Sequence, residues 1–137
     1  MAQIMALDFG IKRTGIAVTD DMKLIASGLK TVPTAELMQF LVQYTTNNNV
    51  DEILVGQPKH VDGKLMSIEQ NILWFIEDLK AKIPGIIVKR IDERFSSKMA
   101  SQHIANSRLK KKKKQSKGLI DEISATILLQ DYLNSSI

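Results

Sequence analysis

The sequence predicts an α/β fold in which helices cover both faces of a mixed β-sheet. Three strand-like segments follow one another in the first thirty residues, and strands alternate with helices in the rest of the chain. The segment 52–56 (EILVG) carries a continuous apolar run, which is typical of a strand covered on both faces. Together these observations favour helices packed on both sides of one sheet.

The first three strands are predicted from short apolar runs and the turns between them. Residues 3–9 form a buried strand, and the alternation over residues 14–20 (TGIAVTD) indicates a second. Asp20 and Asp21 supply a tight turn to a third strand over residues 23–31. This part of the chain is therefore predicted to be an antiparallel meander.

Two helices are predicted from apolar residues at helical spacing. The first has Thr34 as its N-cap, directly after Pro33, and its stripe contains Leu37, Phe40, Leu41 and Tyr44. The second begins at a capping box formed by Ser67 and Gln70. Its stripe contains Ile68, Ile72, Phe75, Ile76 and Leu79. We expect Trp74, which lies among these apolar neighbours, to belong to the core.

The remaining elements continue the alternation. Pro84 and Gly85 end the second helix, and residues 86–92 (IIVKRID) form a strand. A short helix is expected over residues 97–106 and a last helix over residues 119–133. The predicted order is thus βββαβαβαα.

The composition limits the class of protein. A chain of 137 residues, 44% of them hydrophobic, fits one domain with one core. The absence of cysteine excludes disulfides, thiolate metal sites and cysteine nucleophiles, and it suits a reducing compartment. The sequence shows no signal peptide and no apolar stretch of the ~20 residues that a membrane span needs. We therefore expect a cytoplasmic protein without a membrane partner.

The positive charge is concentrated in one segment. The formal net charge is +4, and much of the excess comes from residues 108–117 (RLKKKKKQSK). A local concentration of lysine points to a polyanionic partner such as nucleic acid. The alternative is a solvated loop.

Three carboxylates lie at the ends of predicted core elements. Asp8 lies in or at the end of the first strand, where a buried carboxylate is costly unless another group compensates for it. Glu93 follows the strand 86–92, and Asp121 lies in the first turn of the last helix. The same helix face contains Ala125, Leu128 and Tyr132. Because sites form outside the carboxyl ends of strands in α/β sheets, we expect the three acids to meet there.

Converging carboxylates repel one another unless they bind a cation. Oxygen ligands favour Mg²⁺ or Mn²⁺, and two such ions about 4 Å apart can hold the attacking and leaving oxygens of a phosphodiester. The sequence thus predicts Asp8, Glu93 and Asp121 as ligands of Mg²⁺ or Mn²⁺, with two ions.

Each acid also has a structural alternative. Asp8 could end its strand and accept hydrogen bonds from the following turn. Glu93 could pair with Arg94 or Arg90 on the surface. Asp121 could be a first-turn acid that the helix dipole favours.

Four segments of the chain resemble the YqgF/RuvX family, the Holliday-junction-resolvase-like proteins of bacteria that are also described as pre-16S rRNA nucleases. LDFGIKRTGIAVTD is similar to the opening signature of that family, and VGQPKHVDG to its Gly-x-Pro segment followed by Asp-Gly. DERFSS is similar to its Asp-Glu-Arg block, and KKKKQSKGLIDEISATILLQDYL to its basic stretch and closing Lys-Gly-x-x-Asp helix. The four occur in the family's order over nearly the whole chain.

The resemblance implies a ribonuclease H-like fold, with a five-stranded mixed sheet flanked by helices on both faces, as a single nuclease domain over residues 1–137. It also implies that Asp8, Glu93 and Asp121 are the catalytic residues. Two features depart from the family pattern. Ser124 stands where alanine is more usual, and the lysine run is unusually heavy.

Basic residues near the acids are candidates for substrate binding. Lys12 and Arg13, in the turn after Asp8, can reach phosphates, although both could be ordinary exposed turn residues. Arg94 could hold a phosphate or brace Glu93. The full set is Lys12, Arg13, Lys59, Arg94, Lys110, Lys111, Lys112, Lys113, Lys114 and Lys117. Neither His60 nor His103 is assigned to metal.

The leading hypothesis is a metal-dependent endonuclease whose partner is nucleic acid. The resemblance suggests processing of the 5′ end of precursor 16S rRNA, with four-way DNA junctions as the alternative substrate. A nucleic-acid-binding module without turnover is a second hypothesis. An actin-like ATPase is a third, which a chain long enough for only one lobe disfavours. We expect a monomer or a weak homodimer, because a two-fold junction favours a dimer and rRNA trimming does not.

Overall fold

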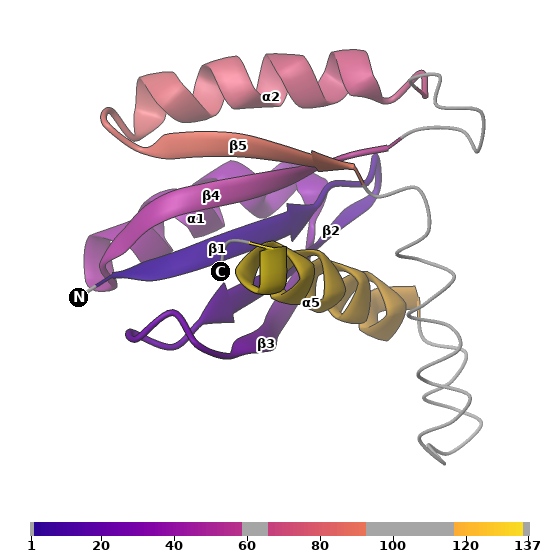
Figure 1. Cartoon of the computed structure of the whole chain (residues 1–137). Coiled ribbons are helices and arrows are strands. Elements are labelled where there is room, and N and C mark those ends of the chain that lie inside the picture. Colours follow the sequence, from indigo (N-terminus) through magenta and orange to yellow (C-terminus); the bar gives the residue numbers. More distant parts are fainter. Residues whose placement is uncertain (1, 59–65, 93–116, 136–137) are drawn as a thin grey trace.

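A computed structural model describes residues 2–58, 66–92 and 117–135, and these residues form one five-stranded sheet with helices on both faces (Figure 1). The strands are β1 (Gln3–Asp8), β2 (Arg13–Thr19), β3 (Ala26–Pro33), β4 (Val50–Gln57) and β5 (Ile87–Asp92), in the spatial order β3-β2-β1-β4-β5. β1, β4 and β5 are parallel, whereas β2 is antiparallel to both of its neighbours. The predicted mixed α/β sheet is confirmed. The helix expected over residues 97–106 lies outside the described residues.

Two helices cover one face of the sheet. They are α1 (Leu37–Asn47), which follows the short 3-10 helix η1 (Thr34–Glu36), and α2 (Glu69–Lys82). Alternate residues of the central strands point to this face, because successive side chains of a strand lie on opposite sides. The buried side chains of this core are Met5, Leu7, Ile16, Val18, Val32, Leu37, Leu41, Ile53, Val55, Ile72, Ile76 and Leu79. The predicted stripes of both helices therefore supply the core.

A single described helix, α5 (Lys117–Ser135), covers the opposite face (Figure 1). The strand residues beneath it are Ile4, Ala6, Ala17 and Leu54, and the helix contributes Ala125 and Leu129. The small side chains of Ala6 and Ala17 let the helix approach the sheet. The predicted face with Ala125 and Leu128 is confirmed, since both side chains are buried. The hydroxyl of Ser124 is buried there without a hydrogen-bond partner among the described residues.

The far end of α5 is fastened to β4 and β5. Lys89 Nζ lies 2.8 Å from Glu52 Oε1 and donates a 2.8 Å hydrogen bond to the Tyr132 hydroxyl. The Glu52 carboxylate, and then the Tyr132 hydroxyl, raise the pKa of Lys89. These contacts hold the C-terminal part of α5 against β4 and β5. They thereby help to fix where the first turns of α5 lie, at the opposite end of the strands.

Both predicted helix starts are wrong, since neither helix has the expected side-chain cap. Pro33, not Thr34, precedes η1, and the Thr34 hydroxyl donates to the Gly10 carbonyl at 2.6 Å. α2 begins at Glu69 after Ile68, with no hydrogen bond from a capping side chain, so Ser67 and Gln70 form no capping box.

The third strand begins later than the sequence predicts. Asp20 accepts hydrogen bonds from the backbone N–H groups of Met22, Leu24 and Ile25 at 3.2, 2.9 and 2.8 Å. These bonds, led by those from Ile25 and Leu24, lower the pKa of Asp20. They close a loop in which Lys23 has a positive φ of 59°. The loop residues therefore cannot join the ladder, and β3 begins at Ala26.

Trp74 does not belong to the core, contrary to the prediction. Its side chain is 58% exposed, whereas Ile72 and Ile76 on the same helix are buried. A residue two positions from a buried one is rotated by about 200° around the helix, so Trp74 lies on the outer side.

No helix in the described part of the chain is long and apolar enough to cross a membrane.

Candidate active site

Asp8 is the last residue of β1, where the strand leaves the core. Its side chain is half-buried, and it lies directly opposite Gly15 on the antiparallel strand β2. Ala6 packs beneath α5, so the alternation of the strand puts Asp8 on the α5 face as well. The carboxylate therefore lies at the edge of the sheet where β1, β4 and β5 all end.

Gly15 allows the first turns of α5 to approach the same place. A Cβ atom built on Gly15 would overlap the backbone carbonyl of Asp121 and would lie 2.9 Å from the Cβ of Asp121. Only a residue without a side chain fits between strand and helix here. Since Asp8 lies opposite Gly15 and Asp121 lies against it, the fold brings together two of the three predicted acids.

The Gly15 contact leads to a first prediction. Gly15→Ala is expected to push the start of α5 off the sheet and to destabilise the protein by about 1–3 kcal/mol, because the added methyl group meets backbone. The matched control is Gly28→Ala on β3 under the same helix, where the nearest atom, Thr126 Oγ1, is 3.4 Å away. Urea unfolding of both variants measures the difference. Equal losses would show that strand propensity, not the Asp121 contact, sets the cost.

Arg13 is the direct partner of Asp121. Its Nε donates a 2.7 Å hydrogen bond to Asp121 Oδ2, and the two side chains are 36% and 24% exposed. The sequence predicted Arg13 as a phosphate ligand and missed this pair. One signal in the sequence could have indicated the pair. Side chains alternate along β2, so Arg13 lies on the same face as Gly15, which contacts Asp121.

The turn between β1 and β2 is held from behind by Thr34. The Thr34 N–H donates to the Lys12 carbonyl at 3.0 Å, its hydroxyl donates to the Gly10 carbonyl, and the Thr14 and Thr34 hydroxyls lie 3.0 Å apart. Gly10, Ile11, Lys12, Arg13 and Asp121 line an open pocket of about 400 Å³ beside this turn. The side chain of Lys12 is exposed. Lys12 in the turn and Arg13 at the start of β2 thus present two basic side chains next to Asp121.

The third acid and most of the basic candidates lie outside the described residues. Glu93 follows Asp92, the last residue of β5, which pairs with Gln57 on β4. The part of the chain that the structure describes contains no cluster of three or more His, Cys, Asp or Glu side chains that could hold a metal. Lys59, Arg94, Lys110, Lys111, Lys112, Lys113 and Lys114 lie outside the described residues, and so does the side chain of Lys117.

A buried ion pair fixes the ends of β4 and β5 beside this edge. Arg90 donates to Glu69 Oε1 at 2.6 Å and to Glu69 Oε2 at 2.8 Å. It also donates to the carbonyls of Val55 and Gly56, both at 3.1 Å. Gln57 Nε2 adds a 3.2 Å hydrogen bond to Glu69. The ion pair thus connects the start of α2 to β4 and β5. It fixes the end of β5, after which Glu93 follows in the sequence.

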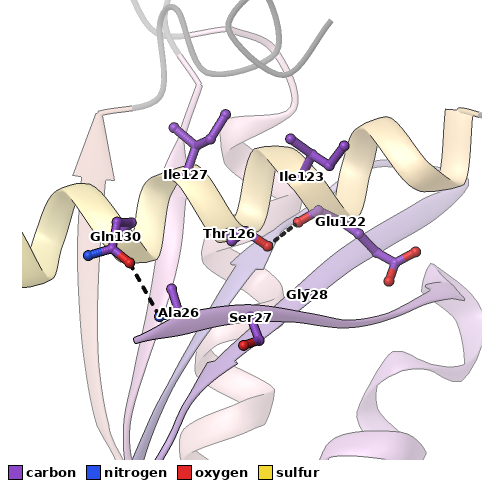
Figure 2. A pocket seen from close by; sticks show the side chains of 8 residues that line it. All are labelled: Ala26, Ser27, Gly28, Glu122, Ile123, Thr126, Ile127 and Gln130. Carbon is purple, nitrogen blue, oxygen red and sulfur yellow. Dashed lines mark hydrogen bonds between the residues drawn. The ribbon is translucent and has the colours of Figure 1, made fainter. Parts of the chain in front are cut away.

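A second hollow lies between β3 and α5, away from Asp8. Its volume is about 460 Å³, and Figure 2 shows its lining residues Ala26, Ser27, Gly28, Glu122, Ile123, Thr126, Ile127 and Gln130. The Gln130 amide oxygen accepts the Ala26 N–H at 3.3 Å, which occupies one backbone donor of the edge strand. Glu122 is the one ionisable residue in this lining, so the hollow does not offer the acid pair of the Asp8 edge.

Glu122 gives a pH-dependent prediction. Burial raises the pKa of Glu122, and a hydrogen bond with Thr31 partly offsets this effect. The folded protein therefore holds this proton more tightly than the unfolded chain, and the resulting stability is lost as the pH rises through the raised pKa. We expect Glu122→Gln to be more stable than the wild type at neutral pH and to lose this advantage in acid. Thermal unfolding between pH 4 and pH 8 tests this, with Asp131→Asn on the exposed side of α5 as control.

Comparisons with known proteins agree with this architecture. The family model described as "RuvX: Holliday junction resolvase" matches residues 2–135. Relatives from Christiangramia forsetii and Flavobacterium johnsoniae are 52% and 50% identical, over 97% and 98% of this chain and 98% of each relative, and both are named "Putative pre-16S rRNA nuclease".

Solved structures resemble the chain in fold at low identity. Thermus thermophilus RuvC in complex with a Holliday junction substrate has a TM-score of 0.60 at 12% identity, over 99% of this chain and 96% of its own. The fowlpox virus Holliday junction resolvase has a TM-score of 0.51 at 16% identity, over 97% and 99%. These likenesses confirm the predicted ribonuclease H-like fold.

Proposed function

Because the chain belongs to the RuvX family of Holliday junction resolvase-like proteins, we propose that it is a metal-dependent endonuclease that processes the 5′ end of precursor 16S rRNA. The curated relatives that share about half of its residues over nearly full length carry the rRNA name. The RuvC complex with a junction shares only 12%. The first likeness favours rRNA as the substrate, and four-way DNA junctions are the alternative.

The observation that carries the proposal is the meeting of Asp8 and Asp121 at Gly15. Two acidic residues from elements more than a hundred residues apart adjoin one glycine through their backbones, at the carboxyl ends of the parallel strands. Their carboxylate oxygens are the donors that Mg²⁺ and Mn²⁺ prefer, and the guanidinium of Arg13 on Asp121 supports the binding of a positive charge at this carboxylate. The residues thus suit a divalent ion. We propose that Asp8, Glu93 and Asp121 hold it, with room for two.

The acidic residues of the site would bind the cations, and the basic residues would bind the phosphates of the substrate. Asp8, Glu93 and Asp121 would fix the position of the cations, which supply positive charge for the attacking water and the leaving 3′ oxygen when bound. Lys12, on the turn held by Thr34, and Arg13, the first residue of β2, would face the phosphates next to the cleaved bond. The basic candidates outside the described residues would neutralise phosphates farther away, which gives affinity without sequence choice.

The rest of the proposal concerns the setting of the reaction. A nuclease of rRNA precursors would act where ribosomes are assembled, so we propose a cytoplasmic location. A single domain that trims one RNA end needs no second active site, so a monomer or a weak homodimer suffices. Cleavage of both strands of a two-fold junction would instead require a dimer.

The test is a cleavage assay with purified protein on two substrates. A precursor 16S rRNA fragment and a four-way DNA junction are incubated with Mg²⁺, with Mn²⁺ or with chelator. We expect metal-dependent cleavage, with the rRNA cut faster than the junction. Faster cleavage of the junction would contradict the choice of rRNA as substrate and would favour a Holliday junction resolvase. Binding of both substrates with no cleavage under any metal would overturn the nuclease proposal in favour of a binding module.

A further inference from the structure

The ion pair between Arg13 and Asp121 points to a role for Arg13 beyond contact with substrate. We propose that Arg13 is the resident counter-ion of Asp121, that a divalent cation displaces its guanidinium when the site is loaded, and that the released guanidinium then serves a substrate phosphate. The inference rests on the proposed function, because it takes Asp121 as a cation ligand.

The metal-free protein needs a counter-charge at this place. Asp8 lies opposite Gly15 and the backbone of Asp121 lies against the same glycine, so two acidic residues occupy neighbouring positions, where like charges disfavour the folded state. Arg13 Nε at 2.7 Å from Asp121 Oδ2 offsets one of the two negative charges. This pairing lowers the cost of folding without metal.

The Arg13–Asp121 ion pair is easier to break than the Arg90–Glu69 ion pair, so a metal ion can replace Arg13. Arg90 binds both oxygens of Glu69 and two backbone carbonyls, and the side chains are only 22% and 9% exposed. The Arg13–Asp121 pair is more exposed, at 36% and 24%. A partly exposed ion pair is worth little against water, so a competing cation can replace the guanidinium at small cost.

The Arg13 side chain can move while its backbone stays in place. Arg13 pairs with Pro33 across the β2–β3 ladder, and the Lys12 carbonyl accepts the Thr34 N–H. The open pocket of about 400 Å³ that Arg13 and Asp121 line lies next to the guanidinium. The released side chain can therefore enter this pocket without any rearrangement of the turn.

Electrostatics sets the direction of the exchange. A divalent cation on Asp121 carries twice the charge of the guanidinium and repels it at close range. The released Arg13 is then stabilised by a phosphate, so metal and nucleic acid strengthen each other's binding. This coupling is reciprocal, since each ligand must raise the affinity of the other by the same factor.

Calorimetric titration with Mn²⁺, without nucleic acid, tests the competition. Arg13→Gln removes the competitor, and we expect it to bind Mn²⁺ roughly three- to tenfold more tightly than the wild type. Lys12→Gln removes the same charge from the adjacent residue, whose side chain has no partner in the described structure. It is the matched control and should tighten Mn²⁺ binding by less than about twofold.

A direct readout in the wild type does not depend on the metal affinity of any variant. The Nε–H resonance of Arg13, assigned by its absence in Arg13→Lys, should shift and lose protection from exchange as Mg²⁺ is added. Weaker or equal Mn²⁺ binding by Arg13→Gln, or an unchanged Nε–H signal while Mg²⁺ binds, would overturn the inference and leave the metal site intact. If the wild type binds neither ion, the metal site of the proposed function fails instead.

Discussion

Asp8→Asn is expected to lower the rate of metal-dependent cleavage by more than about 100-fold and to leave the metal-free protein folded. Loss of a group that only orients a ligand costs 10- to 100-fold, so loss of a direct ligand should cost more. The folded state should be as stable as the wild type or more stable by ~1 kcal/mol, because Asn removes one of two carboxylates beside Gly15.

Cleavage rates at saturating substrate and the metal-induced rise in melting temperature together measure this effect. A cation that binds only the folded protein raises its melting temperature, and this rise should be smaller in Asp8→Asn, Glu93→Gln and Asp121→Asn than in the wild type. Asp51→Asn is the control, since Asp51 is an exposed acid that pairs with Lys23. An Asp8→Asn protein that cleaves normally would return Asp8 to the structural alternative of a strand-ending acid.

Glu69→Ala is expected to destabilise the protein by about 3–5 kcal/mol, the largest loss of stability that we predict. The substitution leaves the Arg90 guanidinium, which is 22% exposed, without its carboxylate partner. Removal of one member of a buried pair costs this much because the remaining charge is desolvated and uncompensated. The change also frees the start of α2 from the ends of β4 and β5.

Urea unfolding gives the measurement, and the exposed pair Lys23–Asp51 gives the control. Its side chains are 39% and 46% exposed, so Asp51→Ala should cost at most about 1 kcal/mol. The double variant Glu69→Met with Arg90→Met should recover most of the stability, since apolar replacement of a whole buried ion pair is often neutral. A loss below about 1 kcal/mol for Glu69→Ala would show that the pair is not needed for stability.

The strands and the helix faces were predictable because their signals are local. Residues 3–8 and 52–56 differ from their surroundings in apolar content, and the stripe of Ile72, Ile76 and Leu79 has the helical period. The same local signals identified Asp8 as a carboxylate at a strand end. They placed Asp121 in the first turn of the last helix, which is wrong, because α5 begins at Lys117 and Asp121 lies in its second turn. Burial of an apolar face depends mainly on composition and period, which the sequence contains directly.

The helix starts were not predictable, because a capping residue is chosen by competition. Thr34 suits an N-cap, but the Gly10 carbonyl of a distant turn accepts its hydroxyl. Ser67 and Gln70 match a capping box, yet α2 begins at Glu69, which Arg90 holds. Trp74 was misplaced for a related reason, since three aliphatic residues already fill the inner face of α2.

The sequence by itself determined the class of fold, the order of the described strands along the chain and the two acids that the fold brings to one edge. Only the tertiary structure decided that Arg13 pairs with Asp121, 108 residues away, and that Gly15 is the point where β2 and α5 touch. A local pattern shows which face of an element is buried. It does not show which distant residue meets that face, because this depends on the strand order and on the place where α5 crosses the sheet.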